Sequence, residues 1–335
     1  MEFRLEFTPR PFLSRINHQH QLLLIGSCFT ENIGSKLKQL KFSVLENPNG
    51  ILFNPISIIK SLDSYIDRRQ YTEADLFYQN ESWNSWEHHS RFSHPDKDAC
   101  LKMINQSQQG AHHFLKKADW LLITLGSAFV YELQSSAGSP AEQDGNVVAN
   151  CHKVPTGKFH KRLLNTTEIT SAFKTLFNKI AIFNPSINFI FTVSPVRHLR
   201  DGFVENNRSK ATLIQAIHEL VDGNDRLVYF PAYELVIDDL RDYRFYAEDM
   251  VHPNYAATNY VWEKFVTAAI DESSQQLMKD INVINAAINH KPFNPTSGAH
   301  QKFLQANFEK LTQLKTQLPY IDFSAEALYF STQRN

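Results

Sequence analysis

A short apolar run that ends at a Gly-Ser pair constrains this chain more than any other stretch: residues 22–29 read LLLIGSCF. Four aliphatic residues in a row indicate a buried strand, and the amphipathic pattern behind Ser27 indicates a helix. Gly26 allows the tight turn between them. The helix start would place free N–H groups and a positive dipole end beside Ser27, which suits a nucleophile. Because such turns also occur without any function, the role of Ser27 depends on partners elsewhere.

Strand and helix patterns alternate along the chain, which is typical of a doubly wound α/β fold. The expected strands of one mostly parallel, five-stranded sheet are residues 22–25, 42–45, 120–125, 188–193 and 226–230. Amphipathic helices are expected after Ser27, from Asn54-Pro55 to residue 66, and over residues 99–117, 166–183 and 207–221. Asn254 is expected to cap one long helix that continues past Ile270 to Ile288.

Two insertions interrupt this alternation. Residues 71–95 are aromatic and polar and indicate a hairpin, and residues 129–155 indicate a second one. In the second hairpin, residues 129–133 lead out, Asp144-Gly145 lies near the far turn, and residues 147–152 return. That return would bring Asn150, Cys151 and His152 to the carboxyl edge of the sheet.

The last part of the chain has a different pattern. Residues from about 275 onward are helical and rich in glutamine, without a strand signal until the end. The expected organisation is therefore a main domain of residues 1–274 and a C-terminal helical extension of residues 275–335.

Charge and cysteine content limit the classes of partner. Lys+Arg 34 against Asp+Glu 35 leaves a net charge of -1, so nothing favours nucleic acid or an anionic membrane surface, and a small-molecule ligand is expected. Cys28, Cys100 and Cys151 are odd in number and widely spaced, which argues against a disulfide framework and fits a reducing compartment. The charged N-terminus and the lack of an 18-residue apolar run predict a cytoplasmic protein. The oligomeric state is left open.

The sequence offers no familiar cofactor or metal motif. It contains no GxGxxG, GxxxxGK[ST] or HExxH, and only 11 of its 335 residues are glycine, so no cofactor is expected. His88, His89 and His94 could suggest a metal site. No acidic or cysteine partner stands at a familiar spacing from them, so they are interpreted as solvated or pocket-lining residues.

A carboxylate and a histidine three residues apart follow the last expected strand. One short loop can present Asp249 to Nδ1 of His252 and leave Nε2 free for a serine hydroxyl. Ser27, near the start of the fold, would complete a triad with them. A Cys151/His152 dyad is disfavoured, because neighbouring residues on a strand point to opposite faces.

These motifs together resemble the GSCFA family over about residues 20–265. The resemblance rests on the segments GSCF (26–29), NGILFNP (49–55), TLGSA (124–128), NCHK (150–153), SPVRH (194–198) and DMVHP (249–253). That family is in turn similar to the SGNH/GDSL hydrolases, which are three-layer α/β/α proteins. The resemblance implies that Ser27 is the nucleophile, His252 the general base and then acid, and Asp249 its orienting carboxylate.

One position departs from the SGNH pattern. Those enzymes complete the oxyanion hole with a glycine N–H, for which Gly50 can stand, and with the asparagine of a Gly-x-Asn motif, where this chain has Ala128. Loss of such a donor costs roughly 2.7–4 kcal/mol of transition-state stabilisation. Asn150 is the first candidate to replace it, before Asn54 and Ser127. Further candidate pocket residues are Cys28, Gly126, His152 and His198.

The function expected from this reading is a serine esterase that removes a small acyl group, such as acetyl, from a carbohydrate-like or other polar substrate. Two alternatives remain open: a ligand-binding or scaffold module without catalysis, and an O-acyltransferase that uses the same residues with a drier pocket. An α/β-hydrolase is disfavoured, because Gly-x-Ser-x-Gly is absent and Asp249 and His252 lie too close in sequence.

Overall fold

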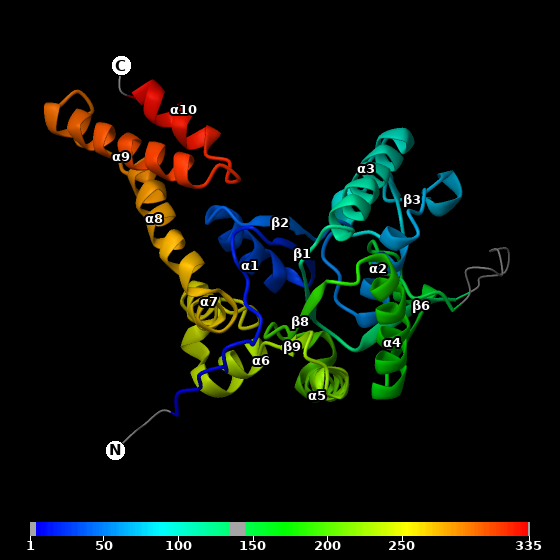
Figure 1. The fold of residues 1–335 in the computed structure, drawn as a ribbon. Coiled ribbons are helices and arrows are strands. Elements are labelled where there is room, and N and C mark those ends of the chain that lie inside the picture. The colour runs from blue at the N-terminus through cyan, green and yellow to red at the C-terminus, as the bar shows by residue number, and fades with distance from the viewer. Residues whose placement is uncertain (1–4, 135–144, 334–335) are drawn as a thin grey trace.

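A five-stranded parallel sheet forms the centre of the protein (Figure 1). The computed structural model describes residues 5–134 and 145–333. The strand order is β2-β1-β5-β8-β9, and the strands are β1 (Gln21–Gly26), β2 (Ser43–Glu46), β5 (Trp120–Leu125), β8 (Asn188–Val193) and β9 (Leu227–Tyr229). All four neighbouring pairs are parallel. The doubly wound α/β fold and its five strands are therefore confirmed.

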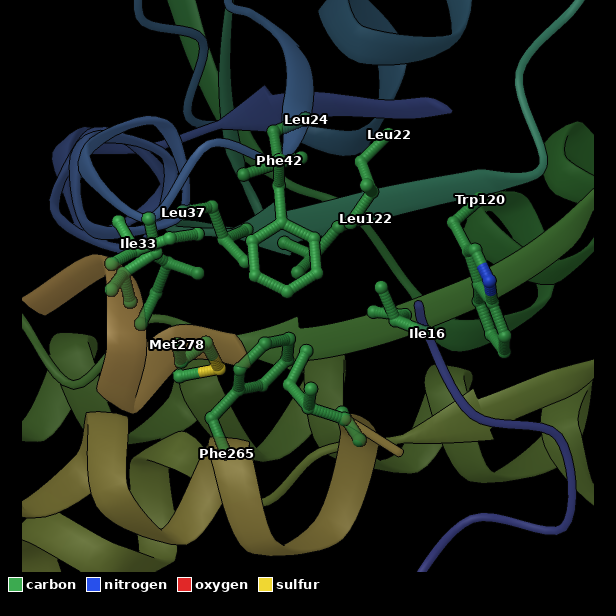
Figure 2. Close-up of a cluster of buried hydrophobic side chains, with 14 of the residues drawn as sticks. Ile16, Leu22, Leu24, Ile33, Leu37, Phe42, Trp120, Leu122, Phe265 and Met278 are labelled. Atoms are coloured by element: carbon green, nitrogen blue, oxygen red, sulfur yellow. The ribbon is translucent and has the colours of Figure 1, made fainter. Parts of the chain in front are cut away.

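Alternate residues of β1 point to two separate apolar layers. Leu22 and Leu24 pack with α1 (Cys28–Gln39) and α7 (Tyr255–Ala269), and Figure 2 shows this layer with Phe265 and Met278 below the sheet. Leu23 and Ile25 face the opposite layer. That layer is built by α2 (Pro55–Ile66), α3 (Lys97–Leu115), α4 (Thr166–Phe183) and α5 (Gly202–Val221). The result is the three-layer α/β/α arrangement that the resemblance implied.

The expected long helix after Asn254 is wrong, because two helices occupy that stretch. Asn254 caps α7 as expected, but α7 ends at Ala269 and α8 (Glu272–Asn289) begins anew with Asp271 as its cap. Two backbone hydrogen bonds to Ile16 stabilise the turn between α7 and α8. Ile16 N–H donates to Ala269 O at 2.7 Å, and Asp271 N–H donates to Ile16 O at 3.0 Å. The chain therefore turns where an N-terminal segment binds it.

The C-terminal helices extend the α1/α7 layer. After α8 come α9 (Gly298–Gln317) and α10 (Ser324–Gln333), which lie at one end of the molecule in Figure 1. Their buried residues belong to the same apolar cluster as α1, and Lys41 pairs with Glu326 at 2.6 Å. Within the described part of the chain, no helix is both long and apolar enough to cross a membrane.

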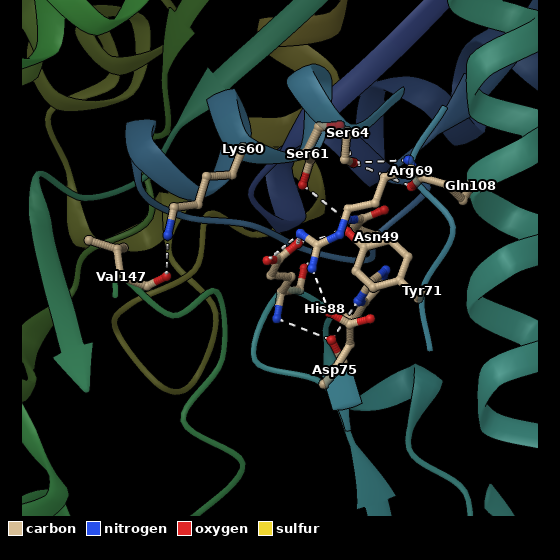
Figure 3. Close-up of polar contacts among 12 residues, drawn as sticks. Asn49, Lys60, Ser61, Ser64, Arg69, Tyr71, Asp75, His88, Gln108 and Val147 are labelled. Atoms are coloured by element: carbon tan, nitrogen blue, oxygen red, sulfur yellow. Dashed lines mark hydrogen bonds and ion pairs between the residues drawn. The ribbon is translucent and has the colours of Figure 1, made fainter. Parts of the chain in front are cut away.

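The expected hairpin in residues 71–95 is present as β3 (Phe77–Gln79) and β4 (Ser82–Asn84). A polar network joins this insertion to α2 (Figure 3). Arg69 binds both Asp75 and Glu87, at 2.6 and 2.9 Å, and the Tyr71 hydroxyl donates to Glu87. Asn49 accepts from the buried Tyr65 hydroxyl at 2.9 Å, which fixes the loop that follows β2.

The second insertion pairs differently from expectation. β6 (Phe129–Leu133) forms an antiparallel ladder with β7 (Phe159–Leu163), and the expected return over residues 147–152 pairs with β6 only at its start. Residues 145–148 follow the other side of β6 for a short distance, where Val148 N–H donates to Tyr131 O at 2.9 Å. Asp144 of the expected turn lies outside the described residues. The backbone turns away from β6 after Val148, and His152 and Lys153 have positive φ. The segment 149–155 is therefore a loop rather than a strand.

Gly26 lets β1 approach β5 where Ser27 leaves the sheet. Its φ is +145°, and a Cβ added there would lie 2.2 Å from the carbonyl oxygen of Thr124. The Ser27 N–H donates to the same oxygen at 3.3 Å. No side chain fits this contact.

Replacement of Gly26 tests this constraint. Gly26→Ala is expected to lower the free energy of unfolding by roughly 2–5 kcal/mol, because overpacking and backbone strain add. Denaturant unfolding followed by circular dichroism measures the change. Gly110→Ala is the matched control: no atom lies within 4 Å of its added Cβ, and it is helical. That variant should gain about 0.5–1 kcal/mol. Native stability in Gly26→Ala would contradict the close approach.

Candidate active site

Ser27 stands between β1 and α1 at the carboxyl edge of the sheet. It is the N-cap residue of α1, yet its side chain makes no cap bond. The residue is 0% exposed, and its Oγ is buried without a hydrogen-bond partner. A buried hydroxyl without a partner is costly, and functional sites are a common reason for one. Ser27 therefore stays the candidate nucleophile.

Asp249 and His252 form a pair within one loop. His252 Nδ1 lies 2.6 Å from Asp249 Oδ2, while Oδ1 accepts from the backbone N–H groups of Val251 and His252. These donations lower the pKa of Asp249 to about 2, with the His252 backbone N–H the largest cause. The ionised carboxylate orients the ring and leaves Nε2 for another partner. Both side chains are about half exposed.

Loop contacts bring this pair to the same edge as Ser27. Arg197 follows β8, and its N–H donates to Val251 O at 3.2 Å, which joins the 194–198 loop to the 249–252 loop. His198 is half-buried, and its Nε2 is enclosed without a hydrogen-bond partner. Burial, helped by the charges of Lys210 and His252, lowers the pKa of His198 to about 4. His198 is therefore neutral and within electrostatic range of His252.

A cavity of about 500 Å³ opens beside this edge. It brings together five of the candidate pocket residues: Asn54, Ser127, Asn150, His152 and His198. Its other walls include Phe53, Phe129, Tyr131 and Lys161. Ser27, Cys28, Gly50, Gly126 and the Asp249–His252 pair are not among its lining residues. The volume suits a small ligand with polar groups.

Several N–H groups that could form an oxyanion hole are already engaged. The N–H groups of Gly126 and Ser127 both donate to Phe53 O, at 2.8 and 3.0 Å. The Gly50 N–H donates to Asn47 O at 2.7 Å, so its use by a substrate would require that turn to open. The Ala128 N–H donates to Ser209 Oγ at 2.8 Å.

The two candidate asparagines differ in what binds them. The Asn54 side chain caps α2: its Oδ1 accepts from Ser57 N–H at 2.8 Å and its Nδ2 donates to Ser57 Oγ at 3.0 Å. Asn150 Oδ1 accepts from His152 N–H at 2.8 Å, and the residue lines the cavity. Asn150 therefore remains the better candidate for a donor.

The cysteines and the remaining histidines have local explanations. Burial raises the pKa of the Cys28 thiol, and it raises that of Cys151 to about 11, so both are protonated at neutral pH. His152 Nε2 lies 2.9 Å from Ser85 O and ties the 71–95 insertion to the cavity wall. Burial holds the pKa of His88 at about 3. Across residues 5–134 and 145–333, no cluster of metal-ligating side chains is found.

The aromatic side chains of the 71–95 insertion form a second layer behind the cavity. Trp86 stacks on Phe77 with ring centroids 3.7 Å apart and meets the edge of Phe159 at 5.8 Å. Phe159 lines the cavity, whereas Trp83 and Trp86 do not. Trp86 therefore supports the wall without forming it, whereas Trp83 packs against the cluster of Tyr71, Cys100 and Ile104.

Family comparison agrees with the motifs. The model of the GSCFA family matches residues 21–265, well over half of the chain. The chain belongs to the GSCFA family. A second model, the C-terminal domain of GSCFA domain proteins, matches residues 281–335. No curated protein matches the chain.

Two solved structures are similar to this GSCFA protein. One is a carbohydrate esterase family 3 protein from Talaromyces cellulolyticus, with 11% identity, a TM-score of 0.37, and coverage of 78% of this chain and 99% of that one. The other is an acetyl esterase mutant with acetate ion, with 11% identity, a TM-score of 0.33, and coverage of 78% and 99%.

Sequence reasoning missed a polar stripe on α5 of this GSCFA protein. Asn206, Ser209 and Lys210 are buried. They lie on the same face of α5 as the buried apolar residues Leu213 and Ile217, at helical spacing. Asn206 Oδ1 accepts from His198 N–H at 2.8 Å, and Lys210 Nζ donates to Gly126 O and Ser194 O, at 2.7 and 2.6 Å. The available signal was a core-facing helix stripe that begins with polar residues.

Titration of Asp249 tests the geometry of the pair without a substrate. Its carboxyl carbon should titrate near pH 2, as its pKa of about 2 requires. This pKa is below the ordinary value of about 3.9. The ionised Asp249 therefore stabilises the fold above about pH 3.9, and this contribution is lost as the pH falls toward the folded pKa. His252→Ala removes the imidazole but keeps both backbone donations, so the midpoint should rise only part of the way.

Nuclear magnetic resonance of carboxyl-labelled protein gives these midpoints. Asp242 is the matched control, because Arg244 lowers its pKa independently of His252. A midpoint of Asp249 that does not move in His252→Ala would contradict the pair.

Proposed function

We propose that this protein is a serine esterase of the SGNH type that removes a small acyl group, such as acetyl, from a carbohydrate-like or other polar substrate. Ser27 is the nucleophile, His252 the general base and then acid, and Asp249 the orienting carboxylate. The observation that carries the proposal is the 2.6 Å contact between Asp249 and His252 Nδ1, at the sheet edge where Ser27 Oγ is buried without a partner.

The proposed reaction has two steps. Ser27 Oγ attacks the ester carbonyl carbon as its proton passes to His252 Nε2, and the Asp249 carboxylate stabilises the imidazolium. The alcohol leaves with that proton, and the acyl group remains on Ser27. Water then attacks the acyl-enzyme as His252 accepts its proton, which releases the acid and restores the Ser27 hydroxyl. The cavity beside the edge, about 500 Å³ in volume, would hold the polar alcohol part.

A specific observation favours a binding or scaffold module as the second candidate. Ser27 is 0% exposed, and the N–H groups of Gly50, Gly126 and Ser127 are engaged within the protein. An O-acyltransferase would use the same residues and differ in the acceptor that attacks the acyl-enzyme.

We also propose a cytoplasmic location, supported by three cysteines that are all free.

Removal of the nucleophile or the base tests the esterase. With a short-chain aryl acetate, Ser27→Ala and His252→Ala should each lower kcat by about 10⁴-fold or more. An activated phosphonate should label the native chain and not Ser27→Ala. Cys100→Ala is the control for loss of a small polar group, because Cys100 is buried in α3 and is not a residue of the candidate site. Turnover equal to native in both variants would exclude hydrolysis and acyl transfer together.

Replacement of Asn150 tests the oxyanion donor. If Asn150 fills the place of the absent asparagine, Asn150→Ala should lower kcat by about 10²–10³-fold with little change in KM, because the donor acts on charge that develops in the transition state. Steady-state kinetics of the same aryl acetate separates the two constants. A larger effect on KM than on kcat would assign Asn150 to substrate contact instead.

A further inference from the structure

Lys210 is a charged residue enclosed at the centre of the molecule. It is 1% exposed, and its Nζ donates to Gly126 O at 2.7 Å and to Ser194 O at 2.6 Å. These carbonyls stand at the carboxyl ends of β5 and β8, which are neighbours in the sheet. The two carbonyls satisfy ammonium protons, but burial of the charge itself still costs free energy, so its retention here requires a reason.

The position of Lys210 relates it to the candidate nucleophile. Its charge acts on the thiol of Cys28, the residue after Ser27, and on the imidazole of His198. Among the described residues, these two are the titratable groups that interact with the Lys210 charge. Cys28 lies on α1, and His198 lies in the loop after β8. Burial lowers the pKa of Lys210 to about 7, so a substantial fraction carries a proton at neutral pH.

Several backbone donors of this edge are already used within the protein, which leaves the Asn150 side chain and the local electrostatic field to act on an oxyanion. The N–H groups of Gly50, Gly126 and Ser127 are engaged, and Ala128 offers only a methyl group. The first turn of α1 has no side-chain cap, so its positive end also faces the buried Ser27. A positive charge in a water-excluded site stabilises a developing anion without reorganisation.

We propose that Lys210 is a positioning residue of the Ser27 site, whose buried ammonium clamps the ends of β5 and β8 and supplies the positive field that the Ala128 position cannot. The inference rests on the proposed esterase function. The Lys210 ammonium donates hydrogen bonds to Gly126 O and Ser194 O and transfers no proton to the substrate. It acts through the loops it holds and through its charge.

Two neutral variants test this role against a matched control. Lys210→Met and Lys210→Gln should lower kcat for the aryl acetate by about 10²-fold with little change in KM. Lys60→Met is the control, since Lys60 also has a pKa lowered by burial and donates to a carbonyl, that of Val147 at 3.2 Å. It should keep the native kcat. A native kcat in a folded Lys210 variant would overturn the proposal.

A second readout does not depend on catalysis. At pH 7 the alkylation of Cys28 by iodoacetamide should slow by about tenfold in Lys210→Met, because a nearby positive charge favours the thiolate. Peptide mass spectrometry separates Cys28 from Cys151, whose pKa responds to Arg200 and which should react at its native rate. An unchanged Cys28 rate would overturn the electrostatic part, and a slower rate with native kcat would show that the charge has no role in turnover.

The native chain decides the question if neither variant folds. Between about pH 6 and 8, alkylation of Cys28 should rise less steeply than that of Cys151, because Lys210 loses its charge in this range. Equal slopes would overturn the proposal. Turnover that survives in Ser27→Ala would instead refute the esterase itself, while the thiol measurements would still report the charge of Lys210.

Discussion

The contact between Gly26 and the backbone of Thr124 determines where the rest of the site can be. A Cβ at Gly26 would lie 2.2 Å from Thr124 O, so glycine alone allows β1 to remain paired with β5 up to its last residue. The chain therefore leaves β1 at the carboxyl edge, and Ser27 enters α1 beside the loop that follows β5. Because parallel strands end at one edge, the loops after β2, β5 and β8 gather there as well.

Polar groups gathered at this edge need hydrogen-bond partners inside the protein, and side chains of α5 provide several of them. Asn206 binds the backbone of His198, Ser209 binds that of Ala128, and Lys210 binds the carbonyls that directly follow β5 and β8. Buried backbone groups left unpaired would destabilise the fold. The same bonds explain why few free donors remain near Ser27, and why a buried charge becomes the notable electrostatic feature of the edge.

Local patterns predicted most of the fold, and long-range pairing accounts for the errors. The five strands follow apolar runs, and Asn54 and Asn254 cap helices as their sequence positions indicated. Residues 147–152 were expected to be a strand because their pattern suits one, but only residues 145–148 follow β6, and β7 forms the ladder on its other side. The helix after Asn254 breaks at Ile270 because Ile16, far away in the sequence, binds there. Neither partner can be read from the segment itself.

The candidate site divides in the same way. The sequence by itself determined the turn that presents Ser27 and the pairing of Asp249 with His252, since a tight turn and a three-residue spacing depend only on neighbouring residues. Only the tertiary structure decided that Ser27 is fully buried, that the N–H groups of Gly126 and Ser127 are engaged by Phe53 O, and that Lys210 lies beneath the strand ends. These properties arise from contacts between segments distant in the sequence, which only the packing of the sheet and α5 brings together.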